Sequence, residues 1–132
     1  MSNTQLITDF VKSKLGCQCP DEVFETVEVQ ENCRLNIDIW LRSRINVGNR
    51  LLVYVVEVNN SVFVHENLLS LVFFGRDEKD MKSFKTFRLV LVADPVEEIK
   101  SAADNIFNDL LNVMDLGDSI HLHVVERGDI TW

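Results

Sequence analysis

Two cysteines and a proline near the start of the chain are the residues best suited to chemistry. Cys17 and Cys19 flank a single glutamine, and Pro20 follows at once. Proline suits the first position of a helix, so Cys19 is expected at a helix N-terminus, where a thiol loses its proton more easily. One hypothesis is therefore a reactive or redox thiol at Cys19. The alternative is a pair of small residues in a tight connection between helices.

The same two thiols can also ligate one soft metal ion, such as zinc or iron, because they are one residue apart. A complete zinc site needs about four ligands. Cys33 and the pair His121 and His123 are the residues able to complete it, and the two histidines share one face of a predicted strand. The metal hypothesis requires that Cys17, Cys19, Cys33, His121 and His123 converge. Otherwise the two histidines are ordinary residues on the polar face of an outer strand.

The spacing of apolar residues predicts the elements that must position these side chains. Helical spacing predicts helices over residues 6–15, over 61–74 and from Pro95 onward, with Asp94 as N-cap, and a short helix opened by Pro20. Apolar alternation or continuous apolar runs predict strands near 27–30 and over 35–42, 51–58, 87–93 and 120–125, with a turn at 46–49. Residues 71–74 also fit a strand, but the polar stretch 75–83 leads directly to the next strand, so we prefer helix.

The resulting order is α, short α, β, β, β, α, β, α, β. It predicts an α/β fold: one domain over residues 1–132, with a mixed sheet of about five strands flanked by helices. The first strands are expected to form an antiparallel meander. The later strands, which helices separate, are expected to pair in parallel.

Two carboxylates lie on neighbouring predicted strands, one within the second strand and one near the end of the third. Asp38 lies on the second predicted strand, and Glu57-Val58-Asn59 ends the third. Over residues 4–94 this arrangement resembles the restriction-endonuclease-like fold, in which an acidic residue and a Glu-x-Lys hold a divalent ion that activates water. The resemblance implies a metal-dependent nuclease-like domain that uses Asp38 and Glu57. Asn59 stands where the family has lysine, which favours a degenerate relative over an active one. The alternative is that both carboxylates face solvent or pair with Arg42 or Arg50.

The charge of the chain bears on its partners. The formal charge is −8, which disfavours nucleic acid because phosphates carry the same sign. No run of about 18 uncharged apolar residues is present, so no membrane-spanning helix is predicted. The first residues lack the basic start and apolar stretch of a secretory signal. We therefore expect a cytoplasmic protein whose three cysteines form no structural disulfide framework.

A run of four large apolar residues, Leu71, Val72, Phe73 and Phe74, cannot turn every side chain toward one core. Exposed apolar patches usually mark a partner surface, and Trp40 lies on the polar side of its strand. These five residues predict a protein partner or self-association. A sheet covered on both faces is the alternative. The leading expectation for function is a non-enzymatic interaction module, with the nuclease-like domain and a thiol redox protein as alternatives.

Overall fold

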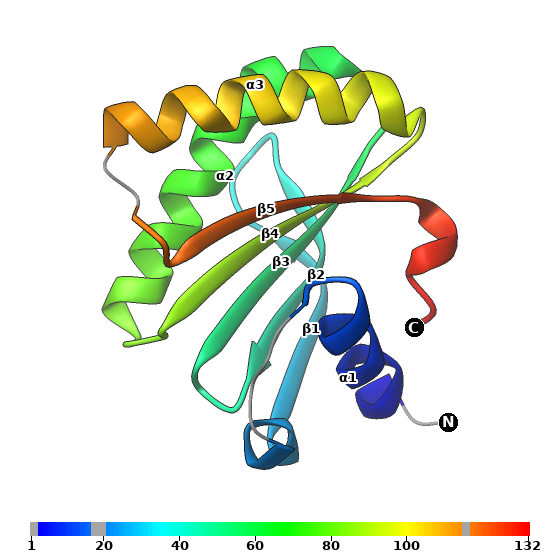
Figure 1. Cartoon of the computed structure of the whole chain (residues 1–132), viewed down its shortest axis with the longest axis vertical. Helices are drawn as coiled ribbons and strands as arrows, with labels where there is room; N and C mark the ends of the chain where they lie inside the picture. Colours follow the sequence, from blue (N-terminus) through cyan, green and yellow to red (C-terminus); the bar gives the residue numbers. More distant parts are fainter. Residues whose placement is uncertain (1–2, 17–20, 115–116) are drawn as a thin grey trace.

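A five-stranded mixed sheet organises the chain (Figure 1). The computed structural model describes residues 3–16, 21–114 and 117–132. In chain order, the elements are α1 (Asn3–Ser13), the 3₁₀ helix η1 (Asp21–Glu25), β1 (Val27–Arg34), β2 (Trp40–Val47), β3 (Leu51–Val58), α2 (Ser61–Met81), β4 (Thr86–Ala93), α3 (Val96–Met114), β5 (Ile120–Val125) and the 3₁₀ helix η2 (Arg127–Asp129). The predicted α/β class and the order of elements are therefore confirmed.

The strands lie side by side in the order β1-β2-β3-β4-β5. The pairs β1–β2 and β2–β3 are antiparallel, whereas β3–β4 and β4–β5 are parallel. The parallel pairs follow from the connections, because a helix carries the chain back across the sheet before each new strand. The predicted meander and the predicted parallel pairs are both present.

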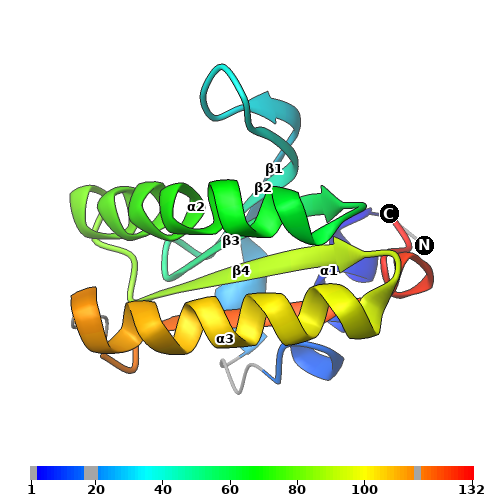
Figure 2. The same cartoon turned by 90° about the horizontal axis from the view of Figure 1, so that it is seen from above.

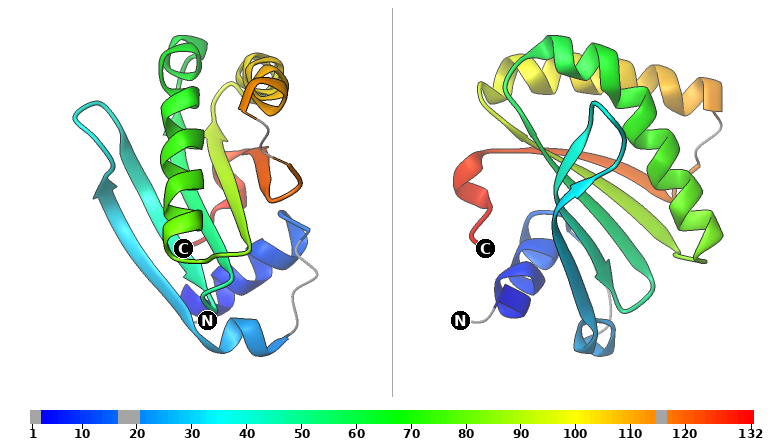
Figure 3. Two further views of the ribbon diagram at one scale, coloured as in Figure 1. Left: turned by 90° about the vertical axis from the view of Figure 1, so that its left-hand side faces the viewer. Right: turned by 180° about the vertical axis from the view of Figure 1, so that it is seen from behind.

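Each face of the sheet has its own apolar core. On β3, Leu52, Tyr54, Val56 and Val58 pack toward α2 and α3, whereas Leu51, Val53 and Val55 pack toward α1 and the C-terminal segment. Figure 1 shows α2 and α3 on one side of the sheet and α1 on the other, and the two views in Figure 3 agree. Because both faces are covered, β3 is apolar at nearly every position.

Helix α2 begins as predicted but is longer than predicted. The Asn60 side chain accepts a hydrogen bond from the Phe63 N–H, which is the usual N-cap contact. The helix continues through the polar stretch to Met81, and Gly75 lets it lie directly on Phe87 of β4. A Cβ at Gly75 would come within 2.1 Å of the Phe87 ring.

Two predicted boundaries were wrong. The second strand begins at Trp40 and not at residue 35, because the Asn36 side chain accepts the N–H groups of Asp38 and Ile39 and folds residues 35–39 into a tight connection. The turn after β2 spans residues 48–50, one or two residues later than the predicted 46–49, because β2 continues to Val47. Helix α3 begins at Val96, after a cis Asp94–Pro95 peptide, so Asp94 and Pro95 lie before the helix.

No helix among the described residues is long and apolar enough to cross a bilayer.

Candidate functional site

The β1–β2 hairpin leaves the sheet at its tip. Pairing between β2 and β3 extends from Val47 opposite Leu51 to Ser43 opposite Val55 and then stops, while β1 and β2 remain paired as far as Arg34 and Trp40. In Figure 2 the hairpin tip projects past α2, clear of the body of the sheet. The upper end of β2 is therefore separated from the end of β3.

Where β2 separates from β3, its apolar side chains also turn from one face of the sheet to the other. Ile45 and Val47 of β2 pack in the α1 core, but Leu41 packs in the α2–α3 core. The reversal falls at Arg42 and at Asn32 of β1, which has a left-handed φ of +53°. Asn tolerates that conformation better than most residues. The twisted hairpin thus opens a space between β2, β3 and the start of α2.

That space is a cleft of about 350 Å³, which we call the hairpin cleft. Its walls combine two aromatic rings with charged and amide side chains from the hairpin, the end of β3 and α2. They are Asn32, Asp38, Trp40, Leu41, Arg42, Glu57, Asn59 and Phe63. Glu57, near the carboxyl end of β3, and Asn59, just beyond that end, form one edge of the cleft.

One side of the cleft is an ion pair. Arg42 Nη1 lies 3.3 Å from Glu57 Oε1, and Arg42 Nη2 donates to the main-chain oxygen of Trp132 at 3.1 Å. The Glu57 side chain is 50% exposed, and within the described residues it forms no other hydrogen bond or ion pair. Nearby, Arg127 donates to the Asn59 side-chain oxygen at 3.2 Å. The Glu57 carboxylate therefore retains an open oxygen.

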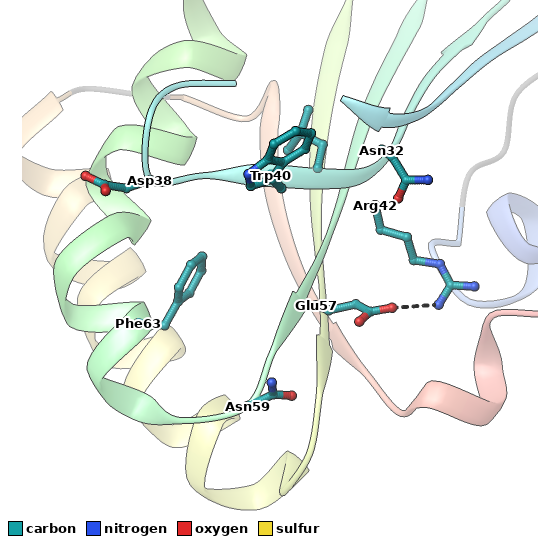
Figure 4. Close-up of a pocket in the computed structure, with 8 residues that line it drawn as sticks. Asn32, Asp38, Trp40, Arg42, Glu57, Asn59 and Phe63 are labelled. Atoms are coloured by element: carbon teal, nitrogen blue, oxygen red, sulfur yellow. Dashed lines mark hydrogen bonds and ion pairs between the residues drawn. The ribbon is translucent and has the colours of Figure 1, made fainter. Parts of the chain in front are cut away.

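The other side of the cleft is aromatic. Figure 4 shows the Phe63 ring directed from α2 into the cleft below Trp40. Trp40 is 56% exposed, and the Arg34 guanidinium lies 5.3 Å from the centroid of its ring. These rings offer an apolar and cation-attracting surface beside the Glu57 carboxylate.

The structure places Asp38 and Glu57 on the same cleft but at different sides of it. Asp38 belongs to the β1–β2 connection and not to the second strand, and Figure 4 shows its carboxylate directed away from Glu57. Glu57 forms the Arg42 ion pair that the sequence offered as an alternative. No three His, Cys, Asp or Glu side chains among the described residues come close enough to hold a metal ion.

The structure describes three of the five candidate zinc or iron ligands. Cys17 and Cys19 lie outside the described residues, so the thiol and metal hypotheses for them stay predictions. Cys33 is half-buried on edge strand β1, whereas His121 and His123 lie on β5, the opposite edge. The structure therefore does not bring Cys33 together with the two histidines.

The two histidines lie beside a half-buried arginine instead. His123 Nε2 lies 2.9 Å from Arg88 Nη1, which also donates to the Leu15 main-chain oxygen at 2.9 Å. Burial, the Arg88 charge and neighbouring His121 together lower the pKa of His123 to about 4. Burial, and then the Arg88 charge, lower the pKa of His121 as well. A neighbouring cation opposes the binding of a metal ion here.

The apolar run on α2 divides between core and surface. Leu71 and Val72 are buried, which corrects their predicted place on a partner surface, and Phe74 is half-buried. Phe73 is exposed, as is Trp40, and their part in a partner surface stays a prediction. Phe73 forms an exposed row on α2 with Val62 and Leu69, at spacings of seven and four residues. We call these three residues the α2 stripe.

Sequence reasoning missed the stripe because it treated the four consecutive residues as a unit. The helical spacing of Val62, Leu69 and Phe73 was the available signal. The cleft had no such signal, because it depends on where β2 separates from β3.

Comparison of the chain with protein-family models, curated proteins and solved structures finds no match.

Proposed function

We propose that this protein is a binding module that docks an apolar, basic segment of a partner protein against α2. The observation that carries the proposal is the α2 stripe, whose three side chains are 58%, 53% and 43% exposed. Apolar side chains in a row at a helix surface are typical of a partner contact.

The charge around the stripe supports a basic partner. Helices α2 and α3 together carry eight acidic and three basic side chains, His65 aside, and one of the three, Arg76, lies over the Phe73 ring of the stripe. A second copy of this chain would bring the same negative charge, so like-charge repulsion opposes self-association. A segment with leucines on one face and arginines on the other would complement both the stripe and its surroundings.

The test uses two 18-residue helical peptides, one of leucine and arginine and the other of leucine and glutamate. Fluorescence polarisation should detect binding of the arginine peptide alone. The double variant Leu69→Ser/Phe73→Ser should weaken it roughly tenfold, which corresponds to about 1.4 kcal/mol. The matched control is Val113→Ser, because Val113 is an exposed apolar residue of α3. Equal binding of both peptides, or a dimer in sedimentation that Phe73→Ser disrupts, would overturn the proposal.

A second candidate function is a nuclease-like domain, active or degenerate, that holds a divalent ion with Asp38 and Glu57. The fact that both residues line one cleft supports it. The Arg42 ion pair and the separation of the two carboxylates oppose it. Calorimetry with Mn²⁺ tests it: binding that Glu57→Ala abolishes would favour this function, and absence of binding would exclude it.

A further inference from the structure

We propose that the hairpin cleft is an arginine-binding site, in which Glu57 and Trp40 hold the guanidinium of a partner's side chain. This inference rests on the proposed function, because the arginine belongs to the segment that docks on α2. Phe63 lines the cleft and Val62 begins the α2 stripe, so the cleft and the stripe adjoin at the start of α2.

An open carboxylate oxygen, and not the net charge, suits the cleft to a cation. Asp38, Glu57 and Arg42 line it, while Arg34 lies over the Trp40 ring and Arg127 donates to Asn59. Arg42 engages only one Glu57 oxygen and divides its guanidinium between that oxygen and Trp132. The second Glu57 oxygen remains available at the cleft.

The chain's own arginines show which cation its walls accept. Arg34 lies over the Trp40 ring, and Arg42 pairs with Glu57. A guanidinium is planar, so it can stack on a ring while its N–H groups donate to a carboxylate. A lysine ammonium is more strongly hydrated and offers no plane to stack. The pairing of the Glu57 carboxylate with the exposed Trp40 ring therefore favours arginine over lysine.

The test uses N-acetyl-arginine amide and its uncharged analogue, N-acetyl-citrulline amide, as probes. In ¹H–¹⁵N NMR spectra of the whole protein, the arginine probe should shift the Trp40 indole N–H and the amides of Glu57 and Phe63 in a saturable way. The citrulline probe should not. Glu57→Gln should weaken binding of the arginine probe at least fivefold. The matched control Asp104→Asn removes one negative charge from exposed α3 and should leave binding unchanged.

Two results would overturn the inference: equal shifts with both probes, or an affinity that Glu57→Gln leaves unchanged. The arginine peptide then separates this inference from the proposed function. If Glu57→Gln leaves peptide binding intact while Leu69→Ser/Phe73→Ser abolishes it, only the cleft assignment fails. If the arginine probe binds at Glu57 and the peptide does not bind, the docking function fails and the cleft assignment stands.

Discussion

Arg42 and Arg44 lie two residues apart on β2, and each pairs with a glutamate, but their surroundings differ. Arg44 Nε donates to Glu78 Oε1 of α2 at 3.0 Å, and the Tyr54 hydroxyl donates to the same oxygen. The Arg44 and Glu78 side chains are 18% and 14% exposed, against 28% and 50% for Arg42 and Glu57. The first pair joins three elements, whereas the second borders an open cleft.

The reversal of the hairpin at Arg42 explains the difference. Arg44 lies on the face of the sheet that α2 covers and donates to Glu78 of that helix. Arg42 turns toward the opposite face and donates to Trp132. A pair that is enclosed on several sides stabilises the fold only while both charges are present. A pair open to solvent contributes little stability and remains accessible to a ligand. The same residue types therefore serve structure at one place and are available for binding at another.

The largest effect is expected from Glu78→Ala. The substitution leaves the Arg44 charge without its partner and removes the acceptor of the Tyr54 hydroxyl, so it should lower the free energy of unfolding by about 2–4 kcal/mol. Urea denaturation followed by circular dichroism measures the change. Asp80→Ala is the control, because the Asp80 side chain is 63% exposed and, in the part of the chain that the structure describes, pairs only with Lys79. An equal, small effect of both substitutions would refute the structural role of Glu78.

A third arginine extends the comparison to a site without a carboxylate. Within residues 3–16, 21–114 and 117–132, Arg88 contacts His123 and Leu15 but forms no ion pair. The pKa of His123 is about 4 in the folded protein, whereas an ordinary histidine has a pKa of 6.5. Between pH 4 and pH 6.5, His123 is therefore mostly protonated in the unfolded chain but mostly neutral in the folded protein. This contribution to stability is complete above pH 6.5 and is lost as the pH falls toward 4.

The loss should be on the order of 1–2 kcal/mol, because solvent reaches part of the imidazole and screens its charge. Urea denaturation from pH 7.5 to 4.5 should show a steeper decline for the wild type than for His123→Gln, which cannot take up the proton. His65→Gln changes an exposed histidine of α2 and should reproduce the wild-type decline. Identical profiles for the wild type and His123→Gln would contradict the low pKa.

Asn32 lies opposite Arg42, between the two ion pairs, and has a left-handed φ of +53°. Asn32→Ala should destabilise the fold by about 1 kcal/mol, because a Cβ without a compensating polar group disfavours the left-handed conformation. Asn32→Gly permits that conformation and should be nearly neutral. The glycine variant should also keep the affinity for N-acetyl-arginine amide. A glycine variant less stable than the alanine variant would show that φ is not the constraint at this position.

The amino-acid sequence predicted the elements better than it predicted the sites. Helical and strand periodicity survive in the fold because each face of the sheet has a core, and the apolar run of β3 identifies a strand buried on both sides. The Asn36 hydrogen bonds that delay the start of β2 to Trp40 are local. The apolar alternation nevertheless continues through residues 35–41, so the pattern alone predicts an uninterrupted strand there. The pairing of Arg42 with Glu57 and of Arg44 with Glu78 depends on the twist of β2, which no local pattern encodes.

The smallest effect is expected at the cleft. Glu57→Gln should change the free energy of unfolding by less than about 0.5 kcal/mol, because Arg42 keeps its contact with Trp132 and reaches solvent. Double-mutant cycles put the two pairs on one scale, with Arg42→Gln and Glu57→Gln in one cycle and Arg44→Gln and Glu78→Gln in the other. The Arg44–Glu78 coupling energy should exceed the Arg42–Glu57 coupling energy by more than about 1 kcal/mol. If the couplings are equal, Arg42 and Glu57 are a structural pair too, and the cleft loses the open carboxylate on which arginine binding depends.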